Sequence, residues 1–176
     1  MGRIIDLSVP LTKRAIHMTT YVIKHIDHQA LMKSRAPELG LTEKEFPEWG
    51  YCASDSVSLI THDGSHMDAP WHFAPTSEGR PSKTIDQVPL DWCYGDGVLL
   101  DFHHFERERP IETDDVKAAF GKISYKLKPR DIVLVRTDAT KHWLEEGFRK
   151  EGAGVTAKAT RWLLDQGVRL TGIDSW

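Results

Sequence analysis

The sequence predicts one domain of the α/β class (α+β in the broader sense), because short apolar strands alternate with amphipathic helices along a chain of ordinary domain length. The chain has 176 residues, enough to enclose a hydrophobic core. Hydrophobic residues make up 40% of it and charged residues 28%, a balance typical of folded proteins rather than disordered ones. We find no internal repeat and no low-complexity tract, so we expect a single domain over residues 1–176.

The N-terminal part predicts two strands separated by an irregular segment. Residues 4–9 alternate weakly and stop at Pro10, as in an edge strand. Residues 21–50 are polar and interrupted by proline and glycine, which predicts a lid-like excursion with a short helix near residues 26–33. Residues 54–62 alternate between two faces and predict the second strand.

The C-terminal part predicts strands that alternate with helices. Thr113 is placed to cap a helix that runs to Phe120, with acidic residues in its first turn and Gly121 at its end. Thr156 is placed to cap a second helix, whose apolar residues recur at three- and four-residue spacing up to Gly167. Three short apolar runs predict the strands: residues 98–102, 132–137 and 168–173.

Charge and cysteine content argue against several functional classes. The 23 basic and 26 acidic residues give a net charge of −3, and no basic run predicts a nucleic-acid or membrane-surface partner. Cys52 and Cys93 form no CxxC pair, so we expect no disulfide framework and a reducing compartment. The N-terminus lacks the apolar core of a signal peptide, and no apolar stretch approaches the ~20 residues of a membrane span. We therefore expect a cytoplasmic protein.

One stretch, residues 62–72, has the composition of a metal site. Imidazole and carboxylate groups together suit Zn²⁺, or Mn²⁺ where oxygen donors dominate. Gly64 and Pro70 argue against a helix here. We expect a turn at residues 63–64 and then an extended piece on which alternate side chains share a face. The candidate ligand side chains are His62, Asp63, His66, Asp68 and His72.

Spacing divides these side chains into ligands and a catalytic group. We expect His62, His66 and Asp68 to bind one ion and leave a position for water, as in catalytic metal sites. Such an ion lowers the pKa of its water toward ~7. His72 lies beyond the proline bend and is predicted to transfer the proton without binding the ion, for which a pKa of about 6.5 is suited. Trp71 is either a core residue or an aromatic wall for a flat substrate.

Other interpretations of the same residues remain open. His72 could complete a closed shell of four ligands in a metal-stabilised binding module without catalysis. The histidines could also have no common role in an ordinary α/β domain. Asp63, which precedes a glycine, is expected to form the turn rather than bind metal. We expect His103 and His104, which follow a strand, to be solvated rather than ligands.

The stretch resembles the motif of the cyclase family of metal-dependent hydrolases, which includes bacterial kynurenine formamidase and isatin hydrolase. Ser65 stands where the family usually has threonine and keeps the hydroxyl group. Residues 6–8, 84–90, 132–137 and 172–175 are similar to other segments of the family, so the resemblance covers most of the chain. The family pattern H-x-G-T-H-x-D-x-P-x-H is matched in register by His62, Gly64, His66, Asp68, Pro70 and His72.

The resemblance implies a swivelling β/β/α domain, usually in a homodimer or higher oligomer. It implies His62, His66 and Asp68 as ligands of Zn²⁺ or Mn²⁺ and His72 as the catalytic acid/base. The implied substrate is a small amide, either an N-formyl aryl amine or an isatin-like cyclic amide. Aromatic residues near the 21–50 segment predict a pocket shaped differently from that of the formamidases: Tyr21, Phe46, Trp49 and Tyr51.

The position of the chain end also enters the prediction. Family members extend well past Trp176, and the formamidase branch takes a second His and a Glu ligand from that later region. Trp176 directly follows the last predicted strand, where a fold normally turns back. We therefore expect a domain truncated at its C-terminus, with one assignable metal site.

Overall fold

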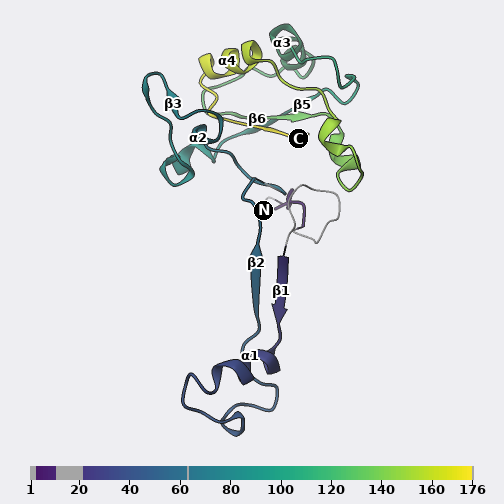
Figure 1. Ribbon diagram of the computed structural model, residues 1–176. Coiled ribbons are helices and arrows are strands. Elements are labelled where there is room, and N and C mark those ends of the chain that lie inside the picture. Colours follow the sequence, from purple (N-terminus) through teal and green to yellow (C-terminus); the bar gives the residue numbers. More distant parts are fainter. Residues whose placement is uncertain (1–2, 11–21, 63, 176) are drawn as a thin grey trace. The chain divides into compact units, whose positions relative to one another are not determined.

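The computed structural model describes residues 3–10, 22–62 and 64–175, which form two compact units. The first unit spans residues 1–68 and the second spans residues 69–176. Each contains both strands and helical segments (Figure 1). Three residues used in the sequence analysis lie outside the described ranges: Tyr21, Asp63 and Trp176.

A two-stranded antiparallel sheet and one helix form the regular part of the first unit. β1 (Val22–Ile26) pairs with β2 (Ser54–Ser58), with Val22 opposite Ser58 and Ile26 opposite Ser54. α1 (His28–Arg35) follows β1 directly. The Asp27 carboxylate accepts a hydrogen bond from the Ala30 N–H at 2.7 Å. This bond caps the first turn and sets where the helix begins.

The strand predicted for residues 4–9 is wrong, because residues 3–10 contain no strand. The Ser8 N–H donates to the Asp6 carboxylate at 2.9 Å. The Val9 N–H donates to the Ser65 hydroxyl, also at 2.9 Å. A strand needs a neighbouring backbone for its amides, and here side chains take that place.

The segment at residues 21–50 is more regular than its composition predicts. Its helix is confirmed, but it covers residues 28–35 rather than 26–33, because Asp27 is the cap. Residues 22–26 were expected to be irregular and instead form β1. The predicted strand at residues 54–62 is confirmed only for residues 54–58. The suggested role as a lid remains a prediction.

A parallel three-stranded sheet with two crossover helices forms the main part of the second unit. The strands are β5 (Gly97–Asp101), β6 (Ile132–Arg136) and β7 (Leu170–Ile173), in the order β5-β6-β7. In sequence α3 (Thr113–Lys122) lies between β5 and β6, and α4 (Ala157–Asp165) lies between β6 and β7. Figure 1 shows both helices on one side of the sheet. The three predicted strands are therefore confirmed to within two residues at either end.

The hydrophobic core lies between this sheet and its helices. Along β5 buried and exposed residues alternate, so that Val98 and Leu100 face the core while Leu99 is 53% exposed. The pleat of a strand produces this alternation. α3 and α4 bury one apolar face each. The largest fully buried side chains are Leu100, Ile111, Val116, Val133 and Val168.

The two helix caps differ in how well they could be predicted. Thr156 caps α4 as expected, and its hydroxyl accepts from the Ala159 N–H at 3.3 Å. The predicted cap of α3 is wrong: Glu112 is the N-cap and Thr113 the first helical residue. Ile111 is joined to Val155 by a parallel β-bridge, which keeps the backbone extended up to the cap. Gly121 does not end α3, which continues through Lys122.

Shorter elements complete the second unit. α2 (Pro70–Phe73) begins with proline at its first turn, where the missing N–H costs nothing. β3 (Thr76–Ser77) and β4 (Arg80–Pro81) form a small hairpin. In the part of the chain that the structure describes, no helix combines the length and the apolar character needed to cross a membrane. The 3₁₀ turns of the described residues are η1 (Glu43–Glu45), η2 (Ile85–Gln87), η3 (Leu90–Trp92), η4 (Ala139–His142) and η5 (Phe148–Lys150).

A buried carboxylate holds the loop that leads into β6. The Asp131 side chain is 2% exposed and lies 3.1 Å from Lys128 Nζ. It also accepts hydrogen bonds from the Lys128 N–H at 2.8 Å and the Tyr125 hydroxyl at 3.0 Å. Burial raises the pKa of Asp131, but the bonds from Lys128 and Tyr125 outweigh it, so that the pKa lies below its usual value.

Asp131→Asn is expected to lower the free energy of unfolding of the second unit by about 1–3 kcal/mol at neutral pH. The folded pKa lies below the unfolded value of about 3.9. The stabilisation from ionised Asp131 is therefore complete above that unfolded pKa and is lost as pH falls through the folded pKa. Urea unfolding at neutral and at acid pH measures the difference. Asp165→Asn, at an exposed position on α4, is the control, and an equal loss at both pH values would contradict the assignment.

Candidate metal centre

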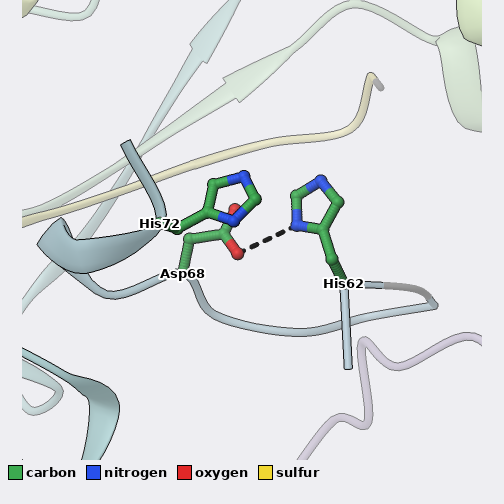
Figure 2. Close-up of side chains that lie close together, drawn as sticks. All are labelled: His62, Asp68 and His72. Carbon is green, nitrogen blue, oxygen red and sulfur yellow. Dashed lines mark hydrogen bonds and ion pairs between the residues drawn. The ribbon is translucent and has the colours of Figure 1, made fainter. Parts of the chain in front are cut away.

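Three of the predicted ligands converge in the first unit. His62 Nδ1 lies 2.9 Å from Asp68 Oδ1, a contact drawn as a dashed line in Figure 2. His66 Nε2 lies 2.9 Å from His62 Nδ1 and 3.5 Å from Asp68 Oδ1. The two imidazole rings meet edge to face, with centroids 4.5 Å apart. Each of the three side chains therefore directs one donor atom at the other two.

The spacing of these donor atoms is that of ligands around one ion. Two donors at ~2.1 Å from the same ion stand about 3.0–3.4 Å apart at octahedral or tetrahedral angles. The three separations, 2.9, 2.9 and 3.5 Å, match these values. Two nitrogens and one carboxylate oxygen are also a donor set that suits Zn²⁺ or Mn²⁺. The residues present therefore fit a divalent metal ion.

A backbone carbonyl orients one of the two imidazoles. His66 Nδ1 lies 3.0 Å from the Gly64 carbonyl oxygen, which can only accept a hydrogen bond, so the proton of this ring sits on Nδ1. His66 Nε2 then presents a lone pair toward His62 and Asp68. Gly64 has a φ of +64°, a left-handed conformation that glycine adopts without strain. This agrees with the turn predicted from the sequence, although the carbonyl contact itself has no sequence signal.

The hydroxyl of Ser65 ties the motif to the N-terminal segment through the Val9 N–H. The three candidate ligand side chains are partly open to solvent, with His62 38%, His66 26% and Asp68 25% exposed. A catalytic ion needs such access for water and substrate. The sequence indicated Gly64 and Ser65 as parts of this motif, but not the contacts that their carbonyl and hydroxyl groups make.

His72 lies on α2, near the start of the second unit. His62, Asp68 and His72 each offer one ligand atom, and these atoms all lie within 4.8 Å of one another (Figure 2). His72 is exposed, as is Trp71 at 55%. The backbone at this point is held by the Trp71 N–H, which donates to the Lys83 carbonyl at 3.0 Å. Both roles of His72, as a further ligand or as a proton-transfer group, stay predictions.

Other histidines of the described residues have different surroundings. His103 Nδ1 lies 2.6 Å from Asp101, and both His103 and His104 are exposed. His25 contacts Asp55 across β1 and β2 at 2.7 Å. His142 lies 3.0 Å from Glu145. Within the part of the chain that the structure describes, none of these joins a group of three possible ligands.

A comparison with protein families matches the Cyclase family over residues 5–176. The chain belongs to the Cyclase family. This match covers nearly the whole sequence and includes the metal-centre stretch. It confirms the family resemblance drawn from the spacing of His62, His66, Asp68 and His72.

Solved structures with the same fold agree with the family. A crystal structure of a novel cyclase matches with a TM-score of 0.66 and 16% identity over 95% of this chain. An isatin hydrolase bound to the product analogue thioisatinate matches with a TM-score of 0.65 and 19% identity over 89% of this chain. Isatin hydrolase A from Labrenzia aggregata, bound to benzyl benzoate, matches with a TM-score of 0.71 and 18% identity over 98%.

The predicted cyclase-type α/β fold is confirmed by these matches. This chain covers 64%, 56% and 68% of the three matched chains, in the same order. It therefore corresponds to about two thirds or less of the length of those proteins. At identities of 16–19%, the likeness concerns the fold, and the activity has to be argued from the site.

Proposed function

We propose that this member of the Cyclase family is a metal-dependent hydrolase that cleaves the C–N bond of a small aromatic amide. The observation that carries the proposal is the convergence of His62 Nδ1, His66 Nε2 and Asp68 Oδ1 within 3.5 Å. Because two solved structures of the same fold are isatin hydrolases, we include isatin-like cyclic amides beside N-formyl aryl amines as substrates.

The roles of the individual residues follow from their chemistry. His62, His66 and Asp68 would hold Zn²⁺ or Mn²⁺, and such an ion supplies a water of lowered pKa and polarises a carbonyl oxygen. His72 takes and returns a proton at its ring nitrogen. When the C–N bond breaks, the carbonyl carbon keeps the oxygen of water and the departing nitrogen receives the proton from His72. The exposed ring of Trp71 offers a flat surface to an aromatic substrate.

Metal content and hydrolysis measured on the same preparation test this proposal. Untagged protein is analysed for bound metals and is then assayed, with Zn²⁺ or Mn²⁺ added, on formanilide, isatin, a simple lactam and a lactone. We expect one tightly bound ion per chain and turnover of formanilide or isatin. Stoichiometric metal without turnover of any substrate would contradict the hydrolase proposal. Absence of metal binding would contradict the metal centre itself.

A second function is favoured by one observation. His72 belongs to the group of three ligand atoms with His62 and Asp68, so it could close a shell of four protein ligands. Closed shells are typical of structural metal sites. In that case the protein is a metal-stabilised binding module without catalysis.

Removal of the metal with a chelator distinguishes the two functions. We expect the second unit to stay folded, because its core consists of side chains from residues 98–168 and includes none of the metal-centre residues. Hydrogen exchange of the Leu100 and Val133 amides should be unchanged while hydrolysis stops. Loss of amide protection together with the metal would instead favour the structural role.

A further inference from the structure

A second site is formed entirely within the second unit, at the carboxyl ends of β5 and β6. A cavity of about 390 Å³ lies there and is lined by residues that directly follow the two strands. His103 follows β5, and Thr137 and Asp138 follow β6. In parallel sheets small molecules bind preferentially at this end of the strands. The volume is within the usual range of ligand sites, roughly 300–1,000 Å³.

The wall of this cavity is held in place by specific contacts. The Asp174 carboxylate accepts hydrogen bonds from the Thr137 N–H at 2.6 Å and the Asp138 N–H at 2.9 Å. Asp138 has a φ of +66°, a strained conformation that is enriched at functional sites. A Cβ at Gly152 would lie 2.7 Å from Thr137 Oγ1 and 3.1 Å from Ala139 Cβ. Only glycine allows this close packing.

The charges that line the cavity are of two kinds. Asp138 is neutralised within the protein, because the Arg136 guanidinium and the Lys141 ammonium donate to it and lower its pKa to about 2. Glu106 and Glu151 also line the cavity, and neither side chain has an ionic or hydrogen-bond partner among the residues that the structure describes. Both side chains are exposed, so a ligand in the cavity can reach their carboxylates.

His103 and Arg107 add groups of a different kind to the cavity lining, an imidazole and a cation. Asp101 Oδ1 lies 2.6 Å from His103 Nδ1 and accepts the His103 N–H at 3.1 Å, which orients the ring and leaves Nε2 for another partner. Arg107 lines the cavity, and its only ion pair among the described residues is a 3.7 Å contact with Glu108. The cavity is thus lined both by unpaired carboxylates and by a cation, Arg107, which has N–H groups left for a ligand.

A metal ion does not account for this arrangement. The cavity carries two histidines and two partner-free carboxylates, yet no three of these donor atoms lie within 4.8 Å of one another in the described chain. A ligand that pairs with Glu106, Glu151 and Arg107 at once would carry both signs of charge and would be larger than a bare ion. We propose that this cavity binds a small zwitterion of the amino-acid class, with its ammonium group toward Glu106 and Glu151 and its carboxylate toward Arg107.

An NMR titration with L-alanine and its two singly charged analogues tests this proposal. Ethylamine lacks the carboxylate and propionate lacks the ammonium group. We expect L-alanine to shift the amide signals of His103, Asp138 and Gly152 at millimolar concentration. Each analogue should bind at least ~10-fold more weakly, since a charge-assisted hydrogen bond is lost. No shift with L-alanine, or equal binding of all three compounds, would overturn the proposal.

Matched variants identify the charged side chains that bind L-alanine. The double variant Glu106→Gln/Glu151→Gln and the single variant Arg107→Gln should each weaken L-alanine binding by ~10-fold or more. Glu146→Gln is the control, because Glu146 is exposed and does not line the cavity. Unchanged affinity in the double variant would refute the ammonium site. Binding should also persist in His66→Ala, so this result is independent of the metal centre and of the proposed hydrolysis.

Discussion

His72→Ala is expected to reduce amide hydrolysis about 10²–10⁴-fold while the protein keeps its metal ion. The three donor atoms of His62, His66 and Asp68 stand within 3.5 Å of one another, and the substitution leaves all of them in place. What it removes is the imidazole that delivers a proton to the departing nitrogen. The measurement combines kcat on the best substrate of the panel with metal content per chain.

His66→Ala is the matched control for this experiment. His66 Nε2 lies 2.9 Å from His62 Nδ1, so its loss removes one of the three converging donors. We expect this variant to lose both metal and turnover. If His72→Ala also lost its metal, His72 would be a ligand and the closed-shell alternative would hold. If His72→Ala kept full activity, the proton-transfer role would be wrong.

Leu100→Ala is expected to have the largest effect on stability, about 2–5 kcal/mol of the free energy of unfolding. Leu100 is 1% exposed, at the centre of the core between the parallel sheet and its helices. Truncation to alanine removes buried methyl groups and leaves a cavity that the surrounding side chains fill only in part. Hydrogen exchange of the β5 and β6 amides reports this loss for the second unit alone.

The adjacent residue provides a control of the same type on the same strand. Leu99 points to the opposite face of β5 and is 53% exposed. Leu99→Ala should therefore change the free energy of unfolding much less, because little apolar surface leaves the protein interior. Equal losses for Leu99→Ala and Leu100→Ala would show that the face opposite the helices is buried too.

Elements that depend on neighbouring residues could be predicted closely. β6 was expected at residues 132–137 and is found at 132–136, because a run of β-branched and apolar residues suits a buried parallel strand. α4 begins after Thr156 as expected, since the hydroxyl of this residue reaches an amide of its own first turn. The metal-centre stretch belongs to the same class, because His62, His66 and Asp68 converge through a single turn at Gly64.

Elements that depend on distant residues could not be predicted. β1 pairs with a strand thirty residues further along, as His25 opposite Asp55 shows, and the composition of residues 22–26 does not indicate that partner. The start of α3 depends on the bridge between Ile111 and Val155. The strand expected at residues 4–9 did not form, because the amides of Ser8 and Val9 bind side chains instead of a neighbouring strand.

The sequence by itself determined the family, the spacing of the candidate ligand residues and the helices and strands whose hydrogen bonds or caps are local. Only the tertiary structure decided which atoms meet: that His62 uses Nδ1 and His66 uses Nε2, and that the ends of β5 and β6 enclose a charged cavity. The physical reason is the same in both cases. The residue types and their spacing indicate which side chains are available. The direction in which each side chain points depends on backbone contacts between segments far apart in the chain.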